Sequence, residues 1–546
     1  MKRIAPKRLV LLAAIMGSFV AGLDATVVNV ALPAVQRDLG GGLAGQQWVS
    51  NGYLLALGAL ILIGGSLGDV LGERRVFSIG VGGFGAASLL CAVAPSIGFL
   101  IGARVLQGVF GALLAPSALA VIVSAFPPDE RGAAIGSWTA WSGIATVIGP
   151  FLGGWLIDAA SWRWIFAINV PFVLATLALV AVAIPPPEPG RTRRTIDWSG
   201  AALCAIGLAG PVYGLIRQPA AGWSSPQVLG PILGGVAVLG AFLWRESRTA
   251  DPMLPLGLFR RRNFAVGNLQ TLSMYGGLSI TFFFLVLYLQ QVAGYDALHA
   301  GLATLPSTLV MFTLSKRFGA LSDRFGPRAF MGCGPLVAAA GLAWFVRMPA
   351  DVSYATDVLP GLLVFSLGLA MTVAPLTMTV LADADEHNAG IASGINNAVA
   401  RVAGLLAIAA LGAVVAATFG SALDKGLAAR ELSPAAARAV AVARDRTLAQ
   451  ADTTGLAPGE AHVVAQAVER ASVHAFHTGI GIAASLVALG GLLGLAGIVN
   501  PRRVVSAAGC AGGQLVGAPE EVALRQGLAS AAGGSGLVTA AAGDIL

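Results

Sequence analysis

Charged residues are scarce in this sequence. Lys, Arg, Asp and Glu make up 11% of its 546 residues, whereas a typical soluble domain has roughly 25%. Hydrophobic residues reach 56% and the mean hydropathy is +0.78. So few charges cannot cover a water-soluble protein of this length, which excludes a cytosolic globular enzyme, and a chain this apolar does not stay disordered. The composition predicts a protein that crosses a membrane several times.

The motifs of common cofactor and metal sites are also lacking. The four cysteines, at positions 91, 204, 333 and 510, form no Cys-x-x-Cys pair, so neither a disulfide framework nor a zinc site is expected. There is no Walker A sequence, and the Gly-x-Gly-x-x-Gly match at Gly80–Gly85 lies inside an apolar run with no strand before it. His474 and His477 are three residues apart without a third ligand. We therefore expect no cofactor and no metal.

Long apolar runs are the dominant feature of the chain. About 20 apolar residues are needed to cross a bilayer as a helix, and the sequence predicts fourteen such spans. They cover residues 9–33, 48–68, 75–95, 97–126, 132–157, 163–184, 198–217, 226–244, 264–290, 299–318, 328–347, 358–381, 389–419 and 477–499. The first is interpreted as an uncleaved span because no small-residue cleavage site follows it. The expected fold is an all-α polytopic membrane protein.

Basic residues predict the orientation. If the N-terminus is cytoplasmic, most basic residues fall in the inner segments, and the short outer loops hold only Arg37, Arg163, Arg217 and Arg347. Such asymmetry marks the cytoplasmic side, so both termini are expected there, in the cell membrane. The net charge of +7 is then explained without nucleic acid. The long outer loop 420–476 is expected to be helical from 434 to 475, and the tail 501–546 to be disordered.

Two loops of similar sequence indicate an internal repeat. GSLGDVLGERR (Gly65–Arg75) and GALSDRFGPR (Gly319–Arg328) both fall on the predicted cytoplasmic side. The predicted domains are two six-helix halves, 1–184 and 263–500, an inserted helix pair at 185–262, and the tail. We predict that these loops form a charge network that gates the inner end; the alternative is a plain turn with basic anchors. The residues of this predicted gating loop pair are Gly65, Asp69, Gly72, Arg74, Arg75, Asp323, Arg324, Gly326 and Arg328.

Three ionisable residues lie well inside predicted spans: Asp24, Arg104 and Arg401. Each costs roughly 2.5–3.5 kcal/mol at a helix centre, so each requires a reason. Asp24 and Arg104 are expected at similar depth, where a carboxyl group beside a guanidinium can bind and release a proton as the protein changes conformation. The alternative is a static ion pair. For Arg401 a structural role is favoured.

These segments resemble the major facilitator superfamily, and within it the fourteen-helix drug:proton antiporters. The resemblance spans roughly residues 9–500. It is carried by Leu-Asp-x-Thr-Val-Val-Asn-Val-Ala-Leu-Pro at Leu23–Pro33, by the loop at Gly65–Arg75, by Arg-x-x-Gln-Gly at 104–108 and by Trp162–Pro171. The antiporter signature of the fifth helix is matched at Gly136, Gly149, Pro150, Gly153 and Gly154. The loop departs from the pattern at Val70 and Glu73, and the signature at Ala145.

The resemblance implies proton-driven export of hydrophobic or amphipathic small molecules, such as drugs, by alternating access. Gln107, Trp138 and Trp141 are the candidate residues of the substrate cavity. Because 264–290 and 299–315 hold no acid, neutral or singly charged substrates are favoured. The alternative is a dedicated exporter of one self-made antibiotic or metabolite. A membrane enzyme or receptor is a remote third hypothesis, which rests on the loop residues Asp383, Asp385, Glu386 and His387. A monomer is expected.

Overall fold

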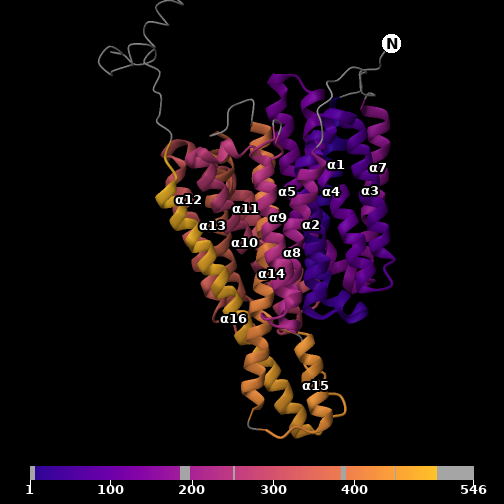
Figure 1. The fold of residues 1–546 in the computed structure, drawn as a ribbon, viewed down its shortest axis with the longest axis vertical. Helices are drawn as coiled ribbons and strands as arrows, with labels where there is room; N and C mark the ends of the chain where they lie inside the picture. Colours follow the sequence, from indigo (N-terminus) through magenta and orange to yellow (C-terminus); the bar gives the residue numbers. More distant parts are fainter. Residues whose placement is uncertain are drawn as a thin grey trace, which may run out of the picture. The chain divides into compact units, whose positions relative to one another are not determined.

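The computed structural model describes residues 7–184, 197–249, 252–382, 389–428, 430–448 and 450–500. These residues form helices joined by short turns, without a strand among them (Figure 1). The predicted tail and the cluster at Asp383–His387 lie outside the described residues. The all-α fold class predicted from the apolar runs is confirmed.

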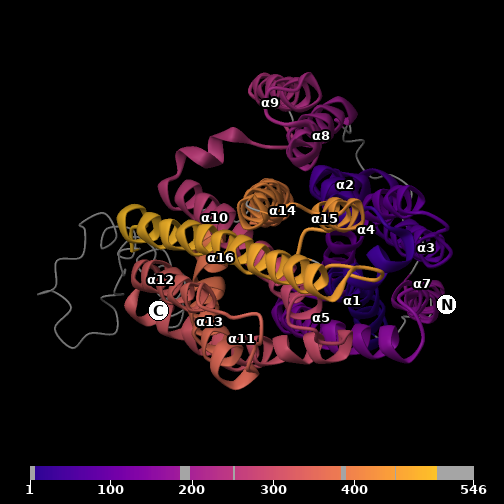
Figure 2. The same ribbon diagram turned by 90° about the horizontal axis from the view of Figure 1, so that it is seen from below.

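The helices before residue 184 form a first set. They are α1 (Lys7–Leu39), α2 (Gly42–Leu71), α3 (Glu73–Ala92), α4 (Ile97–Ala125), α5 (Pro128–Ala159), the short α6 (Trp164–Ala167) and α7 (Asn169–Ala183). An added pair follows, α8 (Trp198–Ala221) and α9 (Pro226–Glu246). Figure 2 shows this pair at the periphery, where α8 contacts α2 and α14.

The remaining helices form a second set. They are η1 (Leu256–Arg260), α10 (Arg262–Gln291), α11 (Ala297–Phe325), α12 (Pro327–Phe345), η2 (Tyr354–Val358), α13 (Leu359–Ala382), α14 (Ala389–Leu427), α15 (Pro434–Asp445) and α16 (Pro458–Gly497). Side-chain oxygens cap several helix starts: Ser96 accepts from the amide of Phe99 (3.3 Å) and Asp296 from that of His299 (2.7 Å). These bonds satisfy amides that have no partner within the helix.

Twelve helices in the part of the chain that the structure describes are long and apolar enough to cross a membrane. The two other predicted spans, 48–68 and 132–157, fall within α2 and α5, which are continuous helices of 30 and 32 residues. The count of fourteen spans stays a prediction. The predicted long outer loop is largely helical: α14 continues to Leu427 and α16 starts at Pro458, and both contact α15.

The two sets repeat the same helix neighbours. In the first set α1 packs on α4, α5 and α7, while α4 also packs on α2 and α3. In the second set α10 packs on α13, α14 and α16, while α13 also packs on α11 and α12. The contacts between the sets are paired too, because α2 meets α14 and α11 meets α5. The structure therefore contains two six-helix halves related by an internal repeat, as predicted; the exact domain boundaries stay a prediction.

The repeated loops have the same backbone conformation. Gly72, between α2 and α3, has φ 88° and ψ 137°, and Gly326, between α11 and α12, has φ 89° and ψ 149°. Each donates its amide to the fourth residue before it, Gly68 at 3.0 Å and Ser322 at 2.8 Å. Only glycine adopts these angles readily, so the glycine of each repeat is required by the turn.

We predict that Gly326→Ala destabilises the protein by about 1–3 kcal/mol, the usual cost of a side chain in this region of backbone space. Gly319→Ala is the control, because Gly319 is helical and an added Cβ would make only an ordinary contact, 3.5 Å from the Cβ of Ala374. The midpoints of thermal unfolding of the purified variants measure the difference. Equal midpoints for the two variants would contradict the strain at Gly326.

Candidate functional site

A buried ion pair joins α1 to α4. Nη1 of Arg104 lies 2.5 Å from Oδ2 of Asp24, and the exposed fractions of the two residues are 1% and 0%. Nε of Arg104 also donates to the backbone oxygen of Val49 in α2 (3.2 Å). The structure thus brings together the two residues predicted for proton coupling, and neither is open to solvent in this conformation.

Three neutral polar residues complete the network around this pair. Nε2 of Gln107 donates to Oδ1 of Asp24 (2.9 Å), and Nδ2 of Asn169 donates to the same oxygen (3.5 Å). Oγ of Ser88 accepts from Asn169 (2.9 Å) and donates to the backbone oxygen of Phe166 (3.0 Å). Asp24 therefore accepts hydrogen bonds from three side chains, which satisfy its carboxyl oxygens away from water.

Aromatic rings enclose the cation of this network. The guanidinium carbon of Arg104 lies 4.4 Å from the ring centroid of Tyr53 and 5.7 Å from that of Phe166. Such faces stabilise a positive charge that water does not reach. A proton that binds Asp24 would remove the negative charge facing Arg104, so these two side chains can change their pairing when the carboxyl group is protonated.

Sequence reasoning missed Ser88, Asn169, Tyr53 and Phe166. Ser88 and Asn169 are polar residues in predicted spans 75–95 and 163–184, which was the available signal. Gln107 was predicted to line the substrate cavity, but it is fully buried and its Oε1 accepts from Arg104 (2.6 Å). In this conformation Gln107 belongs to the ion-pair network and presents no surface to a cavity.

The antiporter signature of α5 touches both α1 and the opposite half. A Cβ on Gly149 would collide with Thr26, and one on Gly153 with Val27, both close to Asp24 on α1. A Cβ on Gly154 would lie 2.5 Å from the backbone oxygen of Ala297 on α11. In the same seam, a Cβ on Gly301 of α11 would meet the backbone oxygen of Pro150. Small residues permit this close packing of helices. Gly136, the remaining residue of the signature, has surroundings that lie outside the described part of the structure.

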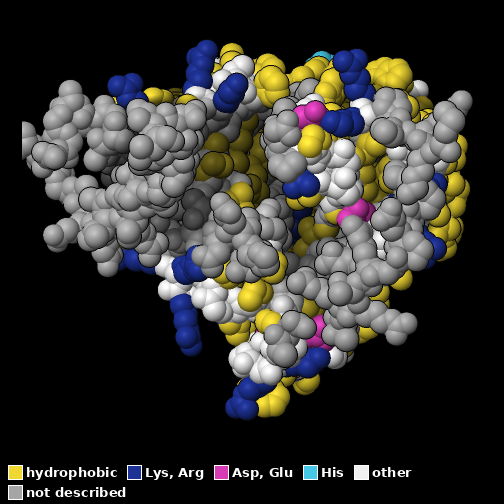
Figure 3. Space-filling model, turned by 90° about the horizontal axis from the view of Figure 1, so that it is seen from above, with side chains coloured by type: hydrophobic (Ala, Val, Ile, Leu, Met, Phe, Trp, Pro, Cys, Tyr) yellow, Lys and Arg dark blue, Asp and Glu magenta, His cyan; other side chains and the backbone are white. Residues whose placement is uncertain are grey.

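The halves touch near the ends of α1 and α5 that are predicted to face outward. Nε2 of Gln290 donates to the backbone oxygen of Val30 (2.9 Å), and Oδ2 of Asp158 accepts from the amide of Leu298 (2.8 Å). From the opposite end, where α1 begins, Figure 3 shows a hollow with hydrophobic side chains inside it. The closed seam and this hollow describe a protein open toward its predicted inner end.

The predicted gating loops lie at this inner end. Arg75, Asp323, Arg324 and Arg328 are exposed, and Arg74 is half-buried. Nε of Arg328 donates to the backbone oxygen of Leu495 (2.7 Å), within the second half. Among the described side chains, no ion pair of these loops joins the halves; those of Gly65 and Asp69 are not described. A gating role of these loops stays a prediction. An open inner end is compatible with it, because a gate would have its charges apart in this conformation.

The two tryptophans predicted to line the cavity differ in their surroundings. Nε1 of Trp138 donates to Oγ of Ser18 on α1 (2.8 Å), whereas Trp141 is 49% exposed. Trp138 therefore ties α5 to α1, and Trp141 has an aromatic face available to a ligand or to lipid.

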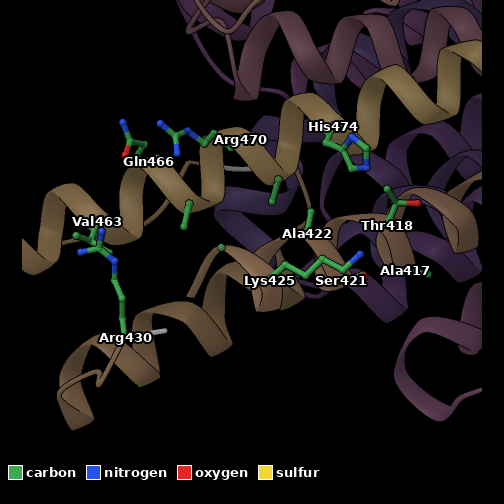
Figure 4. A pocket seen from close by; sticks show the side chains of 13 residues that line it. Ala417, Thr418, Ser421, Ala422, Lys425, Arg430, Val463, Gln466, Arg470 and His474 are labelled. Atoms are coloured by element: carbon green, nitrogen blue, oxygen red, sulfur yellow. The ribbon is translucent and has the colours of Figure 1, made fainter. Parts of the chain in front are cut away.

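A separate cavity of about 640 Å³ lies between the extended ends of α14 and α16 (Figure 4). Its charged or titratable lining residues are Lys425, Arg430, Arg470 and His474. His477 instead faces the backbone oxygen of Met348 (2.8 Å). Within the described ranges no group of three His, Cys, Asp or Glu residues is placed to hold a metal ion.

The fold and the buried network define a polytopic carrier built from two repeated halves. A model of the Major Facilitator Superfamily matches residues 14–408. The tetracenomycin C resistance and export protein of Streptomyces glaucescens is 36% identical over 414 residues, which cover 75% of this chain and 76% of that protein. The puromycin resistance protein pur8 of Streptomyces alboniger is 40% identical over 405 residues, with 72% and 78% covered. The chain belongs to the major facilitator superfamily, and it is a membrane transporter of small molecules and not an enzyme.

A solved structure agrees with this fold. A bacterial homologue of the human lysosomal transporter Spinster, in an inward-facing and unoccupied conformation, aligns with a TM-score of 0.61 at 18% identity. The alignment covers 92% of this chain and 100% of that one. At this identity the likeness concerns the fold alone.

We predict that removing either charge of the buried pair is more harmful than removing both. Asp24→Asn or Arg104→Gln leaves an uncompensated charge away from water, which costs about 3–5 kcal/mol. In the double variant two neutral amides face each other, so it is expected to unfold at a higher temperature than either single variant. Thermal unfolding of the four proteins measures this coupling. Losses that simply add in the double variant would contradict the pairing.

Proposed function

We propose that the chain is a proton-driven antiporter of the cell membrane that exports hydrophobic or amphipathic small molecules by alternating access. The observation that carries the proposal is the buried pair of Asp24 and Arg104 with its three amide and hydroxyl partners. It is a proton-binding group, held away from water, in the half that also carries the antiporter signature. The relatives named for tetracenomycin C resistance and export and for puromycin resistance support drug export.

The proposed cycle links protonation to the movement of the halves. In the open-inward state Asp24 is paired with Arg104. Outward opening requires the seam between α5 and α11 to separate, and α5 packs against α1 beside Asp24. Asp24 takes up a proton from outside, the return step carries this proton inward, and its release to the inside restores the ion pair with Arg104. Each charge that crosses a potential of 100 mV supplies about 2.3 kcal/mol.

A dedicated exporter of one antibiotic or metabolite is the second candidate function. One relative is named for resistance to a single compound, tetracenomycin C, and for its export. The buried network is compatible with either breadth of substrate, so the breadth is decided by transport of a panel of compounds. Cytoplasmic termini and a monomeric state complete the proposal.

We expect Asp24→Asn to abolish proton-driven export. In a host lacking its own pumps, cells with the intact protein should accumulate less of at least one hydrophobic drug, and a protonophore should remove the difference. Asp24→Asn should behave like the empty host, because a neutral amide cannot exchange a proton at this position. Asp38→Asn is the matched control, since Asp38 forms an exposed ion pair with Arg163.

Two results would oppose this proposal. Undiminished efflux by Asp24→Asn would remove Asp24 from the coupling mechanism. Accumulation that is equal in cells with and without the protein, for every compound of the panel, would oppose drug export itself. Equal protein levels in the membrane, measured by immunoblotting, are required for both comparisons.

We also predict that Gly154→Ala opens the predicted outer end. The added Cβ would press on backbone atoms of Ala297 and Leu298, at 2.5 and 2.6 Å, which cannot move independently of α11. A cysteine placed at the buried position Val30, in a chain whose own cysteines are replaced by serine, should then react faster with an impermeant maleimide. Gly98→Ala is the control because an added Cβ there meets open space. Equal labelling rates in the two variants would show that the seam does not control access.

A further inference from the structure

Arg401 is an intramembrane cation that the proposed proton site leaves unexplained. It lies in α14, within an apolar helix that can cross the membrane. Its side chain is half-buried, and it has no ion pair or hydrogen bond with any described residue. Arg104, by contrast, is bound to Asp24 and Gln107. An unpaired guanidinium inside a membrane is costly, so a partner outside the protein is the simplest account of its position.

The surroundings of Arg401 place it at the seam between the halves. A Cβ on Gly58 of α2 would lie 3.4 Å from Cβ of Arg401, so a helix of the first half passes directly beside it.

The same face of α14 is open on the inner side and closed on the outer side. Asn397, one turn before Arg401, is exposed, and its Nδ2 donates to the backbone oxygen of Ser393 (3.1 Å). Toward the predicted outer end, Nε2 of Gln47 donates to the backbone oxygen of Ile408 (2.7 Å) and joins α2 to α14. Arg401 therefore lies between an accessible polar stripe and a closed seam, where a compound entering from the cytoplasm would stop.

We propose that Arg401 binds the acidic group of the transported compound, so that the substrates include amphipathic monoanions with a carboxylate or an equivalent oxygen acid. The guanidinium supplies two parallel N–H donors to such a group, while the apolar part of the compound occupies the hydrophobic hollow. The inference rests on the proposed export function. The sequence favours neutral or singly charged substrates; this proposal specifies that singly charged anions are among them.

Tyr53 gives this site a connection to the proton site. Its ring lies against Arg104, and Gly58, five residues further along the same helix, lies beside Arg401. The helix α2 thus lies against both Arg104 and Arg401, and its movement couples substrate binding to the proton site.

The test compares binding of 1-pyrenebutyrate with binding of its methyl ester. The two probes share the aromatic group and differ in charge. Purified full-length protein in detergent, without any gradient, is titrated with each probe, and quenching of tryptophan fluorescence gives the dissociation constants. Wild-type protein is expected to bind the acid more tightly than the ester; equal affinities would overturn the proposal without any variant.

Variants assign the preference to Arg401. Arg401→Gln should weaken binding of the acid about tenfold, which corresponds to 1.4 kcal/mol, and leave the ester unchanged. Arg401→Lys should retain part of the preference, and Arg217→Gln, the same change at an exposed position of α8, should retain all of it. Equal weakening of both probes by Arg401→Gln would indicate a structural role, and no effect on either would remove Arg401 from the site.

The binding result is independent of the export assay. A preference for the acid that depends on Arg401, in a protein without proton-driven export, would preserve this site and defeat the proposed function. Export of neutral drugs through Asp24, with no preference for the acid, would preserve the proposed function and defeat this site.

Discussion

A carboxylate and a guanidinium that meet without water impose the main constraint on this protein. Either charge alone would be strongly unfavourable where Asp24 and Arg104 lie, so each depends on the other and on the polar groups that complete their hydrogen bonds. Those groups come from α2, α3, α4 and α7 as well as α1. The pair thus fixes how the helices of the first half converge. The same dependence makes the arrangement sensitive to a single proton, because protonation of Asp24 removes the reason for Arg104 to stay where it is.

Close packing between helices connects the Asp24–Arg104 pair to the second half of the protein. Thr26 and Val27, two and three residues after Asp24 on α1, pack on Gly149 and Gly153 of α5, and the next glycine of α5 packs on α11. Only the side chains of Thr26 and Val27 lie between α1 and α5 here, and α5 meets α11 backbone to backbone, so α5 cannot follow α1 without affecting the seam. The glycines therefore act through the volume they leave empty. In the proposed mechanism, the glycines and the proline of the signature pass the effect of a charge on α1 to the opposite half.

The sequence predicted the apolar helices and the two central charges because both signals are local. A charge inside an apolar run is conspicuous whatever surrounds it, which is why Asp24 and Arg104 could be chosen. Ser88 and Asn169 could not, because a single hydroxyl or amide is common in a span and its importance depends on helices that are distant in sequence. The continuation of α14 to Leu427 was missed for another reason: apolar runs stop at the membrane surface, whereas helices stop where their backbone bonding stops. The start of α16 lies in the stretch 434–475 that was expected to be helical, but that stretch is two helices, with a break between Asp445 and Pro458.

The two halves have the same helix arrangement, but their intramembrane charged residues differ. The helices of the second half that correspond to α1 and α4 are α10 and α13. Between Phe264 and Gln291, and throughout Leu359–Ala382, they contain no charged residue. The second half instead has Arg401 on α14, the counterpart of α5, at the seam. A proton and an acidic substrate would then bind in different halves, so neither has to displace the other directly. Their competition has to pass through the seam, which is the part of the molecule that alternating access must open and close.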